Sequence, residues 1–443
     1  MELAGKGEPA AGPGAPQEHT DDVAATVTRS SGFLRDWPRG VRVAVLAQYL
    51  NQTMTAIVLG ALFDAYLLVL RGSNTFVGSL ESARGLASLA LALPLGWAAD
   101  RWPKPLVLRC NAAVGAAASL LLLAGIPSDS VPLIFAGAVA SSLHNQCLFG
   151  LFPALLSEMT EAGDQRMKAL SHMQTAASAG LASGPALQLV LMLATNTTRW
   201  TTSELHWVLC SGLLLFVPFV VLVWRIRHSD LSVGPAAVAA ATSNGGGGQT
   251  PLLRAAAPRQ RWLVAVLVEF SSLVTAIGSG MTFKYWPLFF VRDFGFSPSG
   301  VAALQLAIWA AIAASAQIAP KMARKVGRAP TILLLHVIGT AMLFCISLST
   351  MPALFTAPLV LLRNAVMNGA TPLIQSIVMD TVPQRHRGKW SSIASLRRVT
   401  WSGSAFVGGL LSDSHDYRFA FFATACVHSA AGVVLLAVVA LRP

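Results

Sequence analysis

The stretch Gly96-Trp97-Ala98-Ala99-Asp100-Arg101-Trp102-Pro103-Lys104-Pro105 is a short charged turn between two long apolar runs. Residues 75–95 precede it and residues 106–126 follow it. Each run has the roughly 20 residues that a helix needs to cross a bilayer. The prolines within the turn favour a break in the helix. The stretch therefore predicts two membrane-spanning helices joined by a tight hairpin.

The composition extends this prediction to the whole chain. Of 443 residues, 54% are hydrophobic and only 12% are charged, which lies outside the balance of soluble domains. The apolar runs predict about twelve membrane-spanning helices, at residues 41–66, 75–99, 105–126, 131–156, 169–194, 205–225, 262–291, 299–319, 330–350, 354–380, 392–412 and 419–441. We therefore expect an all-α integral membrane protein.

One longer connection divides these spans into two groups of six. It contains Ser243-Asn244-Gly245-Gly246-Gly247-Gly248, a composition typical of a flexible linker. Asn145 and Pro153 of the fourth span recur as Asn364 and Pro372 of the tenth, both at an offset of 219 residues. We expect a disordered tail at 1–40, a six-helix bundle at 41–225, a linker at 226–261 and a second six-helix bundle at 262–443.

The basic residues indicate how the chain lies in the membrane. The net charge is +12, and most lysines and arginines fall in the tail, the linker and one set of turns. Only four fall in the segments on the other side, namely Arg71, Arg199, Arg292 and Arg418. This is the positive-inside pattern, and it predicts cytoplasmic termini. Because topology accounts for the charge, we expect no nucleic-acid partner.

The opening turn also carries a family signature. Gly96, Ala99, Asp100, Arg101 and Lys104 match the pattern Gly-x-Leu-Ala-Asp-Arg-x-Gly-Arg-Lys. That pattern lies between the second and third spans of major facilitator superfamily transporters, which this chain resembles. The resemblance implies two pseudo-symmetric six-helix bundles that move by rocker-switch alternating access. The site is then expected near the middle of the membrane, between the halves.

The same resemblance implies gating residues. In that family the aspartate of the turn is thought to engage the amino end of the eleventh span. Ser391 and Ser392 are suited to cap that end. We therefore expect Gly96, Asp100, Arg101 and Lys104 to help set the conformation, with Asp100 stabilising one state.

A second motif resembles the drug/proton antiporter branch of the family. Gly180-Leu181-Ala182-Ser183-Gly184-Pro185 matches its Gly-x-x-x-Gly-Pro core, which makes Gly184 and Pro185 further gating candidates. The alternative is close helix packing, for which Gly-x-x-x-Gly is common. Those exporters carry an arginine in the fourth span where this chain has Gln146.

Few charged residues fall inside the predicted spans, and charge in a membrane is costly enough to indicate function. Glu81 and Arg84 are three residues apart and could pair on one helix face. Lys284 is expected to snorkel toward the surface. Glu269 and Arg363 have no partner nearby in the sequence. We expect Glu269 and Glu81 to couple protons, and Arg363 and Arg84 to bind substrate.

Neutral polar side chains form stripes on the first, fourth and tenth spans, which line the cavity in the family. Asn364 and Asn368 are four residues apart and so share a helix face. The alternative is hydrogen bonding between helices, worth about 1 kcal/mol per contact. The full set of expected substrate-binding residues is Gln48, Asn51, Gln52, Thr55, Arg84, His144, Asn145, Gln146, Arg363, Asn364 and Asn368.

These observations predict a secondary transporter of a small organic solute, anionic if Arg363 binds it, with protons as coupling ion. The alternative is a drug or organic-cation antiporter, in which Glu269 would face the substrate's charge. A solute sensor that does not transport is more remote. The sequence has no phosphate-binding loop, nucleophile elbow or metal-ligand cluster, so we expect no enzyme and no cofactor. We expect a monomer in a lipid bilayer.

Overall fold

The computed structural model describes residues 37–160, 164–227, 230, 258–348, 350–381 and 387–441. These residues form helices joined by short turns, with no β-strand among them. The prediction of an all-α fold is therefore confirmed. The predicted tail at 1–40 and linker at 226–261 fall largely outside the described residues.

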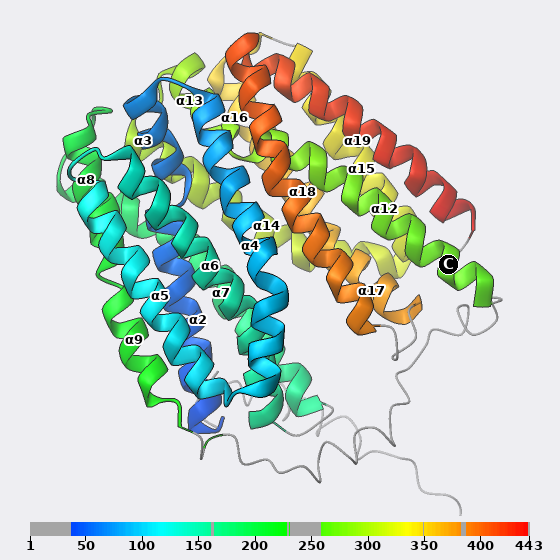
Figure 1. Cartoon of the computed structure of the whole chain (residues 1–443). Helices are drawn as coiled ribbons and strands as arrows, with labels where there is room; N and C mark the ends of the chain where they lie inside the picture. Colours follow the sequence, from blue (N-terminus) through cyan, green and yellow to red (C-terminus); the bar gives the residue numbers. More distant parts are fainter. Residues whose placement is uncertain are drawn as a thin grey trace, which may run out of the picture.

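The helices follow the predicted order (Figure 1). The first half of the chain forms α2 (Arg39–Val58), α3 (Ala61–Arg71), α4 (Asn74–Arg101), α5 (Lys104–Gly125), α6 (Val131–Met159), α7 (Asp164–Ala194), α8 (Thr202–Leu213) and α9 (Phe216–Arg225). The second half forms α12 (Pro258–Phe283), α13 (Tyr285–Phe294), α14 (Pro298–Val326), α15 (Arg328–Leu348), α16 (Ala353–Gly369), α17 (Thr371–Thr381), α18 (Arg387–Ser414) and α19 (Tyr417–Ala440).

Four predicted spans are each built from two consecutive helices: α2 with α3, α8 with α9, α12 with α13, and α16 with α17. With these pairs joined, the described helices correspond to the expected spans. Eight of the segments are long and apolar enough to cross a membrane. The other four, α4, α6, α16 with α17, and α18, hold Glu81, His144, Arg363 and Arg398.

The two halves repeat a local turn. Helix α3 ends at Gly72 with φ 66°, and helix α13 ends at Gly295 with φ 65°. Glycine adopts this left-handed conformation without steric cost. A serine then caps the next helix: Ser73 accepts from the backbone N–H of Phe76, and Ser297 from that of Gly300. Both turns therefore share one sequence pattern: a glycine that ends one helix is followed within two residues by a serine that caps the next helix.

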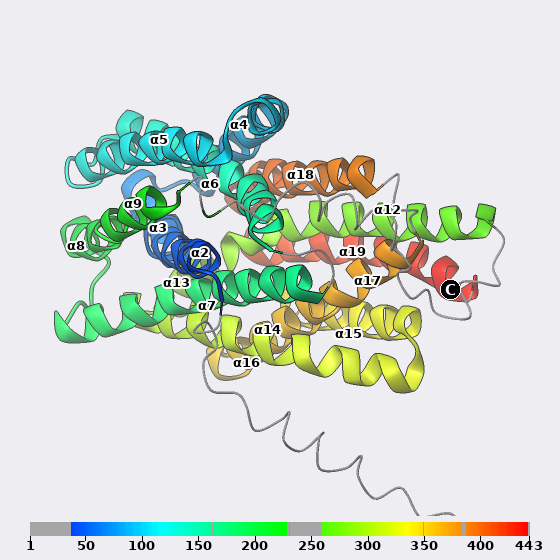
Figure 2. The same cartoon turned by 90° about the horizontal axis from the view of Figure 1, so that it is seen from below.

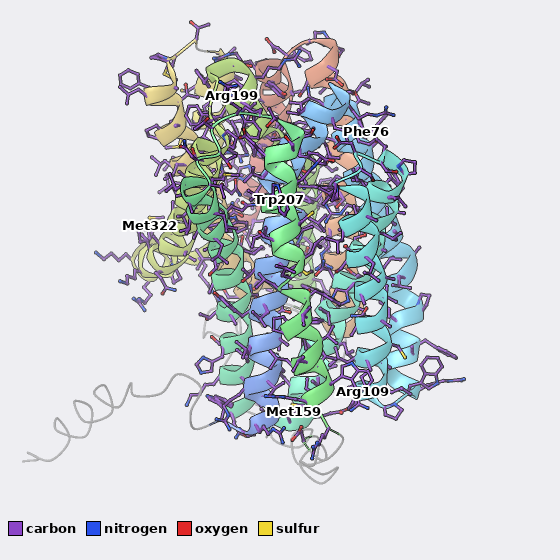
Figure 3. The ribbon with its side chains drawn as sticks, turned by 90° about the vertical axis from the view of Figure 1, so that its left-hand side faces the viewer. Phe76, Arg109, Met159, Arg199, Trp207 and Met322 are labelled. Carbon is purple, nitrogen blue, oxygen red and sulfur yellow. The ribbon has the colours of Figure 1, made fainter. Side chains whose placement is uncertain are left out.

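Seen from below, the helices gather into two groups (Figure 2). Most of α2 to α9 lie on one side, with α12, α15, α17, α18 and α19 on the other. The halves meet where α4 packs beside α18, α7 beside α14, and α13 beside α3. We call the end that holds the turns at 72–73, 126–130 and 415–416 the distal end. The end that holds the start of α2 and the turn at 102–103 is the proximal end. Figure 3 shows Phe76 and Arg199 at the distal end and Arg109 and Met159 at the proximal end.

Large apolar side chains cover the outer surface of the bundle. Trp207 is 80% exposed and faces outward (Figure 3), and Leu120 and Leu354 are similarly exposed. Exposed apolar surface of this extent marks contact with lipid or a partner. It is the surface that the predicted membrane-spanning helices require.

Helices α2 and α7 approach closely at the predicted antiporter motif. A Cβ atom on Gly184 would lie 2.4 Å from the Cβ of Ala56 and so could not be accommodated. Small residues allow such close approach of membrane helices. The close-packing alternative therefore accounts for Gly184, while Pro185 lines the central cavity described below.

The start of α18 corrects one prediction. This helix begins at Arg387, so Ser391 and Ser392 lie within it and do not cap it. The prediction is wrong because the polar residues before the apolar run continue the helix. Gly96 and Asp100 are not among the residues whose side chains the structure describes, so the roles expected for them stay predictions.

The remaining residues of the charged turn make contacts within the first half. The guanidinium of Arg101 lies 4.8 Å from the centre of the Trp97 ring, and Lys104 forms an ion pair with Glu158 of α6. Both contacts lie at the proximal end, and neither reaches the second half.

Candidate functional site

A cavity of about 770 Å³ lies between the two halves, and both contribute to its walls. A second cavity, of about 490 Å³, lies mainly against the first half. The two are contiguous, because they share the lining residues Thr55, Glu81, Arg84, Phe149, Leu181, Arg398 and Trp401. Both volumes lie in the range of small-molecule sites, roughly 300–1,000 Å³.

Four charged side chains, three of them buried and Arg84 partly buried, join the halves at the wall of the larger cavity. Lys284, between α12 and α13, places Nζ 3.1 Å from Asp64 Oδ1 and 3.4 Å from Glu81 Oε2. Arg84 Nη1 donates to Glu81 Oε2 at 2.7 Å, so the pairing that their spacing allowed is present. Ser402 of α18 donates to Glu81 Oε1 at 3.3 Å. We call Asp64, Glu81, Arg84 and Lys284 the charge network.

The charge network corrects the expectation for Lys284. Its side chain is only 8% exposed and lies between two carboxylates rather than snorkelling to the surface. Two acids and two bases balance one another, which is how buried charges are tolerated. Asp64, which was not among the predicted site residues, is an essential member because it shares Lys284 with Glu81.

Arg363 of α16 lacks an acidic partner among the described residues, unlike Arg84, Lys284 and Arg397. It is 4% exposed, and its Nη1 donates to Asn364 Oδ1 at 3.5 Å. The guanidinium also lies 5.7 Å from the centre of the Trp286 ring. Its Nε and Nη2 atoms find no acceptor among the described residues. A buried charge left this way is costly unless an anion supplies the partner.

Glu269 has a partner that the sequence did not reveal. Arg397 of α18 places Nη1 3.2 Å from Glu269 Oε2. Both residues belong to the second half, and Arg397 also lines the larger cavity. The pair leaves little net charge at this wall.

Arg398 reaches across to the first half. Its Nη1 donates to Gln146 Oε1 of α6 at 2.8 Å, and its guanidinium lies 3.8 Å from the centre of the Phe149 ring. Gln146 stands where the drug/proton antiporters named above carry an arginine. Here it contacts an arginine from the other half instead. Arg398 was not predicted as a site residue, because a count of basic residues places it with the inner turns.

An amide cluster lines the second cavity. Asn51 Nδ2 donates to Asn145 Oδ1 at 2.8 Å, and Thr55 donates to the same oxygen at 3.5 Å. Asn51 Oδ1 and Gln48 Oε1 are buried and find no donor among the described residues. The predicted residues Gln48, Asn51, Gln52, Thr55, Asn145 and Gln146 all line this cavity.

The other predicted residues divide between cavity and packing. Asn364 and Asn368 line the larger cavity, as expected of one helix face. His144 instead lies away from both cavities, contrary to the prediction: its Nδ1 is 3.0 Å from the carbonyl oxygen of Asn111, and its ring packs on Phe216 and Phe219. Aromatic packing within the first half explains this placement.

Comparison with known proteins supplies a family. A model described as Major Facilitator Superfamily matches residues 43–405. No match is found among curated protein sequences.

Several solved structures share the fold. The nucleoside transporter NupG is 13% identical over 91% of this chain and 99% of its own, with a TM-score of 0.60. The inward-open xylose transporter XylE from E. coli is 14% identical over 89% and 95%, with a TM-score of 0.65. A bacterial homologue of the iron transporter ferroportin, in an inward-facing state, is 13% identical over 90% and 98%, with a TM-score of 0.68.

Proposed function

Because the chain belongs to the Major Facilitator Superfamily, we propose that it carries a small organic anion across a membrane by alternating access between its two halves. The observation that carries this proposal is Arg363. It is a buried guanidinium on the wall of the central cavity, with two N–H groups that no described residue accepts. A bound carboxylate or phosphate would supply both acceptors.

The charge balance of the cavity supports an anionic substrate. Among the described residues, five arginines and lysines line it: Arg84, Lys284, Arg363, Arg397 and Arg398. Asp64 and Glu81 balance two of them, and Glu269 balances Arg397. Two positive charges remain, and positive potential in a low-dielectric cavity concentrates anions.

The organic-cation alternative has less support. It requires Glu269 to face the substrate, but Glu269 Oε2 is paired with Arg397 and is not among the residues that line either cavity. A cation in the larger cavity would also lie beside the unneutralised Arg363.

Coupling and orientation are part of the same proposal. Protons are assigned to Glu81 and Glu269, because each is a buried carboxylate in an ion pair that weakens when the carboxylate is protonated. The proximal end and both termini face the cytoplasm, the halves are residues 41–225 and 262–443, and the transporter acts as a monomer.

The test is a thermal-unfolding screen of purified protein in detergent. Citrate, benzoate and glucose 6-phosphate represent anions, adenosine represents neutral solutes, and tetraphenylphosphonium represents cations. A ligand that binds the folded state raises the unfolding temperature. We expect an anion to stabilise the wild type but not Arg363→Gln.

Arg71→Gln is the matched control, since Arg71 is exposed at the distal end and far from the cavity walls. It should respond to the anion as the wild type does. Stabilisation by the cation alone, undiminished in Arg363→Gln, would replace this proposal with the exporter alternative.

A further inference from the structure

We infer that the substrate is a hydroxyl-bearing organic anion, such as a sugar acid or a sugar phosphate, held at two ends. Its charged group binds Arg363 of the second half, and its hydroxyl groups bind the oxygens of Asn51 and Gln48 in the first half. This inference rests on the proposed function and adds the chemical class of the substrate. It depends on the unpaired polar atoms of both halves.

The amide end of the site is short of hydrogen-bond donors. Asn51 is 1% exposed, and Asn145 fixes its orientation by accepting from Nδ2 at 2.8 Å. This leaves Asn51 Oδ1 as a buried acceptor without a donor among the described residues, and Gln48 Oε1 is in the same condition. Buried polar atoms are nearly always paired, so these two oxygens indicate a ligand that donates.

The chemistry of the surroundings narrows that ligand. A carboxylate or phosphate can only accept, so it cannot pair with either oxygen. A metal cation could, but Arg398 lines the same cavity without an acidic partner among the described residues and would repel it, while Glu81 is already paired with Arg84. Neutral O–H groups donate to amide oxygens without either conflict.

The charged end of the site is short of acceptors. Arg363 offers Nε and Nη2, which find no acceptor among the described residues. These two N–H groups lie on one edge of the planar guanidinium, the geometry that binds a carboxylate or phosphate through two parallel bonds. One end of the site therefore needs hydrogen-bond donors and the other needs an anionic acceptor. A hydroxylated anion supplies both, whereas a fatty acid lacks the donors and an uncharged sugar lacks the anion.

One molecule can reach both ends because the cavities are contiguous. Arg363 lines only the larger cavity, and Gln48 and Asn51 line only the smaller one. Thr55, Glu81, Arg84 and Trp401 are among the residues that line both. A substrate that spans this junction touches both halves at once, as alternating access requires.

The experiment compares probes that differ only in their hydroxyl groups. Gluconate is paired with hexanoate, and glucitol 6-phosphate with hexyl phosphate, so that each pair shares a head group and an open six-carbon chain. Affinity is measured on purified protein from the concentration dependence of thermal stabilisation. We expect a hydroxylated anion to bind the wild type at least about tenfold more tightly than its plain partner, because a site built to pair with hydroxyl groups rejects analogues that lack them.

Two variants test which residue binds each end of the substrate. Gln48→Met preserves side-chain length and removes no hydrogen bond that the structure describes for Gln48, so folding should be unaffected. It should reduce the preference for the hydroxylated anion severalfold and leave the plain anion unchanged. Arg363→Gln should weaken both members of a pair.

The outcomes separate this inference from the proposed function. Equal affinity for the two members of each pair, or an equal loss of both in Gln48→Met, overturns the hydroxyl end while leaving anion transport intact. This is also the result expected if water alone occupies the amide cluster. If none of the four anions stabilises the wild type, the proposed function itself fails.

Discussion

The distal and proximal ends of the bundle are held by different kinds of contact. At the distal end Asp413, in the last turn of α18, binds the start of α4 in the other half. Its carboxylate accepts from Ser73 Oγ at 2.8 Å and from the backbone N–H groups of Asn74 and Thr75 at 3.0 and 2.7 Å. At the proximal end Lys104 pairs with Glu158 inside the first half.

Other contacts repeat this difference. Trp200 Nε1 donates to the carbonyl oxygen of Phe296 at 2.7 Å, which joins distal turns of the two halves. Arg328 donates to Ser376 at 3.2 Å at the proximal end, inside the second half. Figure 1 shows α4 and α18 side by side at the distal end and diverging toward the proximal end.

This difference indicates which contacts must break when the two halves move relative to each other. Bonds between the halves close the distal end, and the charge network lies beneath them as a deeper cross-half contact. Bonds within a half can persist through a rigid-body movement, whereas bonds between halves cannot. The structure is therefore closed at the distal end.

The largest expected effect comes from breaking the charge network. Lys284→Met leaves Asp64 without its cation and removes one of the two cations that pair with Glu81. Removing one partner of a buried ion pair costs about 3–5 kcal/mol. We expect a loss of this order in the free energy of unfolding, measured in mixed micelles.

A second substitution sharpens that test. Adding Asp64→Asn to Lys284→Met should recover much of the loss, because Glu81 retains Arg84 and Ser402. A double variant no more stable than Lys284→Met would show that the network does not stabilise this state.

A smaller effect is expected at the distal closure. Asp413→Ala removes a carboxylate that caps α4 from the other half, and loss of such a cap costs about 1–2 kcal/mol. This corresponds to roughly a tenfold shift toward a distal-open state. Spin labels at Arg71→Cys and His415→Cys, introduced after replacement of the native cysteines, should report a longer distance.

Lys104→Ala is the matched control for this measurement, because its ion pair lies within one half. It should leave the distance between the labels unchanged. An equal shift in both variants would remove the distinction between contacts across halves and contacts within them.

The smallest effect concerns a distal contact inside the first half. Burial alone would raise the pKa of Asp129, but hydrogen bonds from Tyr66 and His206 outweigh it and hold this pKa below the ordinary value. A carboxyl group with a lowered pKa stabilises the fold above its unfolded pKa of about 3.9, and this contribution disappears as the pH falls through the folded pKa.

Tyr66→Phe removes one of these bonds, so it should destabilise the protein by about 1 kcal/mol near neutral pH. The difference from the wild type should shrink as the pH falls below about 4. Unfolding measured from pH 7 to pH 3 provides the check. The spin-label distance should not change, since Asp129 joins elements of one half.

The sequence predicts the spans better than the pairings between them. Apolar runs locate the helices because each must match the thickness of a bilayer. Arg363 was predicted to bind substrate because nothing near it in the chain could neutralise it, and it lines the larger cavity. In contrast, the pairing of Asp64 with Lys284 joins residues 220 positions apart and depends on how the halves meet.

Dependence on how the helices pack also explains the other contacts that were not predicted. Arg397 and Arg398 lie beside each other in α18, yet one turns to Glu269 in its own half and the other to Gln146 in the opposite half. Adjacent residues on a helix point in different directions, but the sequence does not say what stands in each direction. His144 was misplaced because a polar residue on a cavity-lining span was assumed to face the cavity.

The hydrogen bond between Arg398 and Gln146 has a kinetic consequence. On the proposed mechanism, an empty carrier that changes state must release Arg398 into the cavity with nothing to replace Gln146. A loaded carrier brings an anion that can take that place. The return of the empty carrier is then the slow step, so the protein should trade one anion for another faster than it allows net flow. Proteoliposomes loaded with a transported anion should show faster release with the same anion outside than without it, and Gln146→Leu should narrow this difference.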